Sequence, residues 1–103
     1  MAKKVIWSEL AVADRKNILS YWIFRNKSKT YSVKLDFLFR EAVLLISEYP
    51  FIGKPTDIKN IRAKKVRDYF IMYQEKEDQV HILTIWDTRQ NPSGISKKIR
   101  RAK

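Results

Sequence analysis

Apolar residues recur with a helical period through the first half of the chain. A short run, KKVIW at residues 3–7, precedes this pattern and predicts a strand. Ser8 then offers an N-cap, and Ala11, Ile18 and Trp22 follow at steps of seven and four. This spacing predicts a first amphipathic helix directly after the strand.

A second helix has the clearer pattern and follows the polar connector RNKSKT at residues 25–30. Its apolar positions alternate steps of four and three until Pro50 stops them; they are Tyr31, Leu35, Leu38, Ala42, Leu45 and Tyr49, widened by Phe39 and Ile46. Two amphipathic helices with a short connector predict an antiparallel helical hairpin. A coiled-coil dimer is the alternative.

The hydrophobic period changes after a loop at residues 49–60, which Pro50, Gly53 and Pro55 punctuate. Three β-rich runs follow, separated by RD and EKEDQ: IRAKKV, YFIMYQ and VHILTIW. They predict a three-strand antiparallel meander, which the N-terminal strand can join at an edge. The expected fold is therefore α+β, in the order β-α-α-β-β-β, with a helical hairpin packed on one face of a small antiparallel sheet.

The last two runs are apolar on both alternating faces. One helical hairpin covers only one face of a sheet. Either the C-terminal segment or a partner must therefore cover the other face, or these are simply central strands of a small domain.

Charge is the strongest compositional signal. The 103 residues include 22 lysines and arginines against 11 acidic residues, which gives a net charge of +11. This field favours an anionic partner: nucleic acid, an acidic protein or a membrane surface. We expect one domain over residues 1–96 and a basic C-terminal tail over residues 97–103. That tail can be a short helix, a nucleic-acid arm or, most commonly for such segments, a frayed end.

Cysteine is absent, which excludes disulfides and thiolate metal sites. The N-terminal residues show no apolar segment of a secretory signal, and the apolar runs are far shorter than the ~20 residues needed to span a bilayer. We expect a cytoplasmic protein that needs no membrane.

A basic segment and two tyrosines supply the candidate binding residues. Strand alternation predicts that Ile61 and Ala63 face the hairpin while Arg62 and Lys64 point outward, where Arg89 can converge on them around a phosphate or carboxylate. Tyr69 and Tyr73 can add stacking surfaces. The candidate residues for binding a partner are Arg62, Lys64, Lys65, Arg67, Tyr69, Tyr73, Arg89 and Gln90. A solvated, lysine-rich sheet edge is the alternative.

The sequence contains few residues that would indicate catalysis. The single histidine, His81, lies in an apolar strand, and neither a metal-ligand cluster nor a cofactor motif is visible, so we expect no metal and no cofactor. Any catalysis would depend on Arg89 and Arg62 stabilising charge at a phosphate, with the hydroxyl of Tyr73.

The chain resembles the RelE/ParE superfamily of type II toxins, also called plasmid stabilisation proteins. The resemblance rests on SELAVADRKNILSYW, YPFIGKP, IRAKKVRDYFIMYQ and VHILTIWDTRQNP, and on the set Pro-x-x-Gly-Lys, Arg, Tyr-x-x-x-Tyr and Ile-x-x-x-Arg. It implies the fold expected above. It also implies an antitoxin that wraps the toxin in a hetero-oligomer and covers exposed apolar surface.

The resemblance implies one of two alternative targets. RelE-like members cut mRNA in the ribosome, whereas ParE-like members poison DNA gyrase. Phe70 stands where RelE-like nucleases commonly carry an arginine, and no tyrosine or histidine follows Arg89 to act as the usual acid or base. We therefore expect a non-enzymatic toxin that inhibits DNA gyrase. The alternatives are a RelE-type endoribonuclease and a non-toxic basic nucleic-acid-binding module.

Overall fold

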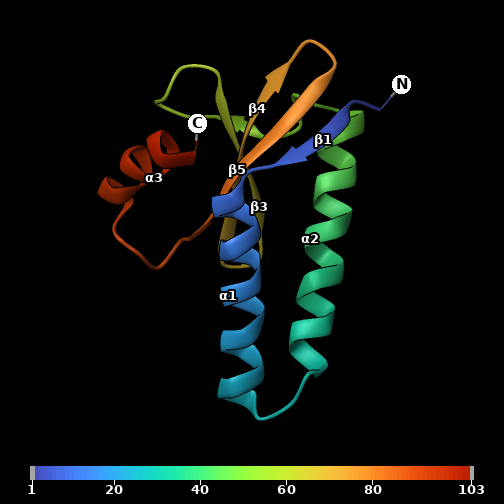
Figure 1. The fold of residues 1–103 in the computed structure, drawn as a ribbon, viewed down its shortest axis with the longest axis vertical. Coiled ribbons are helices and arrows are strands. Elements are labelled where there is room, and N and C mark those ends of the chain that lie inside the picture. Colours follow the sequence, from blue (N-terminus) through green and yellow to red (C-terminus); the bar gives the residue numbers. More distant parts are fainter. Residues whose placement is uncertain (1, 103) are drawn as a thin grey trace.

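A helical hairpin, a five-stranded sheet and a short C-terminal helix form three layers in the computed structural model, which describes residues 2–102 (Figure 1). In chain order the elements are β1 (Lys4–Trp7), α1 (Glu9–Asn26), α2 (Thr30–Glu48), β2 (Lys54–Pro55), β3 (Ile61–Val66), β4 (Tyr69–Lys76), β5 (Gln79–Asp87), η1 (Pro92–Gly94) and α3 (Ile95–Ala102).

The sheet has the strand order β1-β5-β4-β3-β2. Strands β3, β4 and β5 form the antiparallel meander that the sequence predicts. Strand β1 joins at the edge, as expected, but it pairs with β5 in parallel, from Lys4 opposite Gln79 to Trp7 opposite Ile82. The long connection through the two helices permits this parallel pairing. The sheet is therefore mixed.

The first helix begins where the sequence places its N-cap. The Ser8 hydroxyl accepts a hydrogen bond from the Ala11 N–H at 2.9 Å and donates one to the Leu83 carbonyl at 2.7 Å. One side chain thus caps α1 and fixes its start to β5. The helix ends at Asn26, and the next residue, Lys27, has a left-handed φ of 52°.

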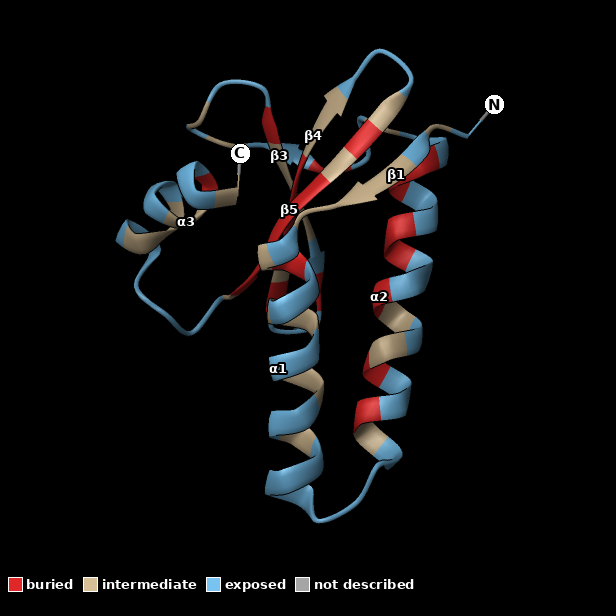
Figure 2. Ribbon diagram, viewed as in Figure 1, coloured by how far each residue is buried: buried red, intermediate tan, exposed pale blue. Residues whose placement is uncertain are grey.

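The antiparallel hairpin is confirmed. Helix α2 returns beside α1, and the Ser32 hydroxyl donates a hydrogen bond to the Leu19 carbonyl at 3.0 Å. Near the turn, the rings of Trp22 and Tyr31 pack edge to face with centroids 4.9 Å apart. The buried side of α2 is rotated relative to the predicted stripe: it consists of Ser32, Leu35, Phe39, Ala42, Val43, Ile46 and Ser47, whereas Leu45 and Tyr49 are exposed (Figure 2).

The C-terminal helix covers the second face of the sheet. Ile99 is fully buried among Met72, Leu83 and Trp86, which point away from the hairpin. The Lys98 ammonium pairs with the Asp14 carboxylate of α1 at 2.7 Å. Residues 97–102 are therefore helical and packed, not the frayed tail that is more common for such a basic segment, because Ile95, Ile99 and Ala102 form an apolar stripe. No helix formed by residues 2–102 is long and apolar enough to span a membrane.

Candidate functional site

The faces predicted for β3 are reversed in the structure. Arg62 and Lys64 lie opposite Tyr73 and Ile71, whose side chains belong to the core beneath the hairpin. Ile61 and Ala63 instead pack with Met72 on the α3 side. The prediction was wrong because it placed the apolar residues of β3 against the hairpin, although the other face of the sheet has an apolar core of its own. A second apolar layer lies beneath α3, and near the edge of the sheet the basic side chains reach solvent from the hairpin side.

Tyr73 does not form the stacking surface that the sequence predicts. It is completely buried, its hydroxyl donates to the Pro50 carbonyl at 2.8 Å, and it accepts from the Gly53 N–H at 2.9 Å. Burial raises the pKa of this phenol above its ordinary value. Arg62 serves the same loop, because its guanidinium donates to the Gly53 carbonyl at 2.7 Å and lies over the Phe51 ring. These two predicted catalytic residues therefore hold the loop before β2.

Tyr69 is also a core residue and not a stacking surface. Only 2% of it is exposed, and its hydroxyl accepts from the Trp22 indole N–H at 2.8 Å. Burial is the main cause that raises its pKa. Both tyrosines of the Tyr-x-x-x-Tyr pattern thus form a hydrogen bond with a segment far away in the sequence, which gives each of them a structural role.

Arg89 lies at the rim of a hollow, beyond the end of β5. Its guanidinium Nη2 is 2.8 Å from a carboxylate oxygen of Asp87, and this hydrogen bond is the main reason why the pKa of Asp87 lies below its ordinary value. The same ion pair raises the pKa of Arg89. Gln90, Tyr21 and Tyr69 line the same hollow, which measures about 350 Å³.

Arg89 and Arg62 do not converge. Strands β3 and β5 run in the same direction, so Arg62, near the start of β3, and Arg89, beyond the end of β5, lie at opposite ends of the sheet. Arg67 lies at the same end as Arg89, in the turn between β3 and β4. The prediction that these cations cluster was wrong. Alternation along a strand specifies the face of the sheet on which a side chain lies, but not the end of the sheet.

The ring of His81 has a hydrogen-bond partner within its own strand. Its Nε2 lies 2.9 Å from the side-chain oxygen of Gln79, within the same strand, as expected for a hydrogen-bonded sheet histidine. Among residues 2–102, no group of three or more histidine, cysteine or acidic side chains could hold a metal ion.

A surface that the sequence interpretation missed lies on the outer side of the hairpin. We define the hairpin face as five exposed apolar residues of α1 and α2: Val12, Ile23, Val33, Phe37 and Leu44. Phe37 and Leu44 are 58% and 57% exposed. A hollow of about 520 Å³ opens beside Val12 and Ile23. The signal was available, because Val33, Phe37 and Leu44 recur at steps of four and seven, as a second apolar stripe.

An ion-pair network crosses the hairpin close to this face. Asp36 of α2 accepts from the Arg15 guanidinium of α1, with Nε at 2.8 Å, and pairs with Arg40 at 2.9 Å. This network joins the two helices beside the hairpin face.

Comparison with known proteins agrees with this fold. Residues 5–92 match the family model described as the ParE toxin of the type II toxin–antitoxin system parDE. A solved structure described as the chromosomal ParDE toxin–antitoxin system from P. aeruginosa has the same fold, with a TM-score of 0.75 and 16% sequence identity; the match covers 85% of this chain and 98% of that chain. Among curated proteins, none matches the chain in sequence.

The fold and the matched region define a class, the toxins of type II toxin–antitoxin systems. Within this class, the chain belongs to the ParE toxin family. The matched region ends at Pro92, so α3 lies outside it.

Proposed function

We propose that this chain is the toxin of a toxin–antitoxin pair, that a cognate antitoxin neutralises it, and that its target is DNA gyrase. The hairpin face is the observation that carries the need for a partner. Five apolar side chains on two adjacent helices form a surface of the kind that monomeric proteins seldom leave uncovered. A folding antitoxin segment would bury them and offset the entropy of its own ordering.

Gyrase is favoured as the target because the residues for RNA cleavage are not assembled. Attack by a ribose 2′-oxygen needs a general base and a general acid beside the charge-stabilising groups, and such assistance is typically worth about 10²–10⁴-fold in rate. Here Tyr73 is buried and bonded twice, His81 is bonded within its strand, and the guanidinium of Arg89 is paired with Asp87. A toxin that inhibits gyrase by binding to it needs no general acid or base.

We expect induction of this chain alone to arrest growth, with DNA synthesis falling before protein synthesis. Co-expression of the antitoxin encoded beside it should restore growth. The measurement is pulse-labelling of DNA and protein after induction, with the same gene carrying an early stop codon as the control.

Two outcomes would count against this proposal. Early loss of translation with codon-periodic cuts in ribosome-bound mRNA would identify a RelE-type nuclease. Unimpaired growth in cells that hold the folded protein would exclude both toxin mechanisms and leave the basic nucleic-acid-binding module.

A further inference from the structure

The end of α1 that leads into the hairpin turn is strongly basic. The sequence has six lysines and arginines and no acidic residue between Asp14 and Asp36. Arg15 pairs with Asp36, but Arg25, near the end of the helix, forms no ion pair with any of residues 2–102. Figure 1 shows that this end of α1 projects beyond the sheet, and Figure 2 shows that it is mainly exposed. A polyanion can therefore approach it without competition from carboxylates of the helix end.

Two aromatic side chains lie close to Arg25 and are well exposed. Phe24 is 85% exposed, more than any other large apolar side chain of residues 2–102. Tyr21 is 45% exposed, and its separation of three residues from Phe24 makes the two side chains neighbours on the helix surface. The Tyr21 ring packs at a steep angle against Trp22, with centroids 5.1 Å apart, and this contact orients it. Exposed rings beside arginines are typical of surfaces on which unpaired bases stack.

Tyr21 also lines the hollow of about 350 Å³ that has Arg89 at its rim. The Arg89 guanidinium lies over the Trp22 ring, 5.8 Å from its centroid, so Tyr21 and Arg89 contact the same indole. The rings and cations at the end of α1 therefore continue into those of the hollow. We define the α1 surface as the six residues of this region that can meet a ligand: Tyr21, Phe24, Arg25, Arg89, Gln90 and Lys98.

The two cations of the hollow are paired with acids but remain available to a ligand. Arg89 pairs with Asp87 at 2.8 Å, and Lys98 pairs with Asp14 at 2.7 Å. The cation is the more exposed partner in each pair, with side-chain exposures of 52% against 22% and of 25% against 11%. Arg89 directs Nε and Nη2 at Asp87, which leaves its Nη1 able to donate to a phosphate. The side of the hollow that faces solvent is therefore basic.

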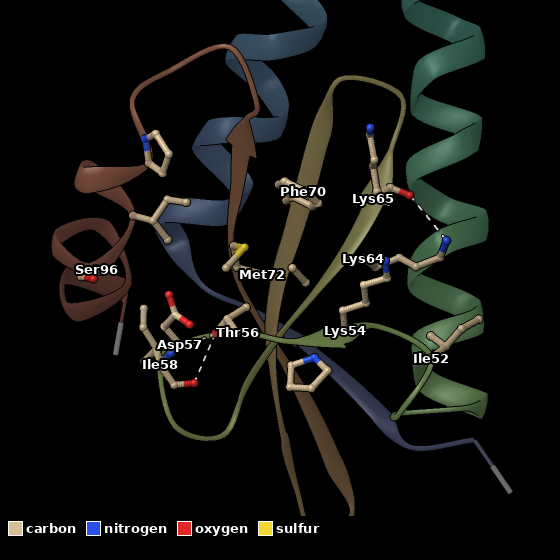
Figure 3. A pocket seen from close by; sticks show the side chains of 14 residues that line it. Ile52, Lys54, Thr56, Asp57, Ile58, Lys64, Lys65, Phe70, Met72 and Ser96 are labelled. Carbon is tan, nitrogen blue, oxygen red and sulfur yellow. Dashed lines mark hydrogen bonds between the residues drawn. The ribbon is translucent and has the colours of Figure 1, made fainter.

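A larger hollow, of about 670 Å³, on the α3 side of the sheet is less suited to bases (Figure 3). Lys54, Lys64 and Lys65 line it, but Phe70 is its only aromatic side chain and is partly buried. Stacking of successive bases uses several aromatic platforms beside the cations. The α1 surface supplies two such platforms and the larger hollow does not.

We propose that the α1 surface binds single-stranded nucleic acid, with bases stacked on Tyr21 and Phe24 and phosphates held by the three cations. The amide of Gln90 can donate to and accept from the edge of a base. This binding is a function additional to the proposed action on gyrase, and it requires no cleavage of the strand. An anionic membrane fits less well, because helices that lie on membranes bury a broad apolar face and the α1 surface offers two rings. An acidic polypeptide would leave these rings without a role.

The test is fluorescence anisotropy of a labelled thymidine strand of about ten nucleotides, a length within the usual site size, titrated with the purified chain. We expect Phe24→Ala to weaken binding by about 5- to 150-fold, through the loss of one stacked base. The matched control is Phe51→Ala. Phe51 is 67% exposed but lies beside Arg62, at the other end of the sheet, so this variant should bind as tightly as the original chain.

The contribution of phosphate contacts is tested separately. Arg25→Gln should weaken binding and reduce the slope of log affinity against log salt concentration by about 0.7, the value for one phosphate contact on a single strand. Lys59→Gln removes the same charge from an exposed residue near Phe51 and should leave this slope unchanged. A uridine strand of the same length is the second nucleic-acid probe, and the tighter of the two strands shows whether DNA or RNA is the ligand.

All four substitutions are at exposed positions and should leave the fold intact, which circular dichroism checks. The proposal would be overturned if neither strand bound, if Phe24→Ala and Phe51→Ala lost equal affinity, or if Arg25→Gln kept the full salt dependence. It would also be overturned by tighter binding of a DNA duplex, a glutamate peptide or phosphatidylserine vesicles than of either single strand. Since only the purified chain and these probes are present, no result depends on gyrase or on an antitoxin.

Discussion

Replacing Leu44 by glutamate should weaken binding of the proposed antitoxin by about 30- to 1,000-fold, equivalent to about 2–4 kcal/mol. Leu44 lies on the hairpin face and is more than half exposed in the free chain. Its substitution therefore costs the free fold little. In the complex the new carboxylate would lose water without gaining a partner, which is a severe penalty within an apolar interface. The measurement is calorimetric titration of the purified chain with the antitoxin encoded beside it.

The matched control is Lys34→Ala, which lowers the net charge by the same amount on the same helix. Lys34 is exposed and lies outside the hairpin face, so its removal should change affinity only through long-range attraction to an acidic partner. Similar affinities for Leu44→Glu and the original chain would show that the antitoxin does not dock on this face.

Replacing Gly53 by alanine should lower the free energy of unfolding by about 2–4 kcal/mol, from overpacking and from lost buried hydrogen bonds. A Cβ at Gly53 would lie 2.6 Å from the Tyr73 hydroxyl oxygen and 3.0 Å from the Ala63 carbonyl oxygen. The phenol is fully buried and bonded on both sides, so it cannot move without losing its bonds to Pro50 and Gly53. Thermal denaturation should show a melting temperature lower by roughly 10–20 °C.

Gly94→Ala is the comparison for this effect. A Cβ there would meet only the outer edge of the Trp86 ring at 3.0 Å, and no hydrogen bond depends on that contact. We expect a clearly smaller loss of stability. Equal melting temperatures for both variants would mean that the loop before β2 adapts to the added methyl group.

Much of the fold could be predicted from local patterns. The N-cap at Ser8, the two helical periods and the apolar runs of β3, β4 and β5 each depend on residues close together in the chain. The parallel pairing of β1 with β5 could not be predicted in this way, because it joins strands more than seventy residues apart. The same holds for the pair of Lys98 with Asp14, which joins α3 to α1.

The candidate site was less predictable than the fold. Alternation along β3 correctly separated Ile61 from Arg62 but did not reveal which face each occupies, because both faces of the sheet are apolar. The sequence also does not show whether a tyrosine lies in the core or in a binding site, because its ring packs well in a core and its hydroxyl can bind a partner. Only the distant partners, Trp22 for Tyr69 and the loop at Gly53 for Tyr73, assign both residues to the core.

The proposed role as a gyrase toxin is tested most directly with purified components. Relaxed plasmid DNA, DNA gyrase and ATP are mixed with increasing amounts of the chain, and supercoiling is followed by gel electrophoresis, with and without the antitoxin. We predict that supercoiling fails as the chain reaches stoichiometric amounts and recovers when the antitoxin is added first. Undiminished supercoiling at a large excess of folded chain would contradict the assignment of gyrase as the target.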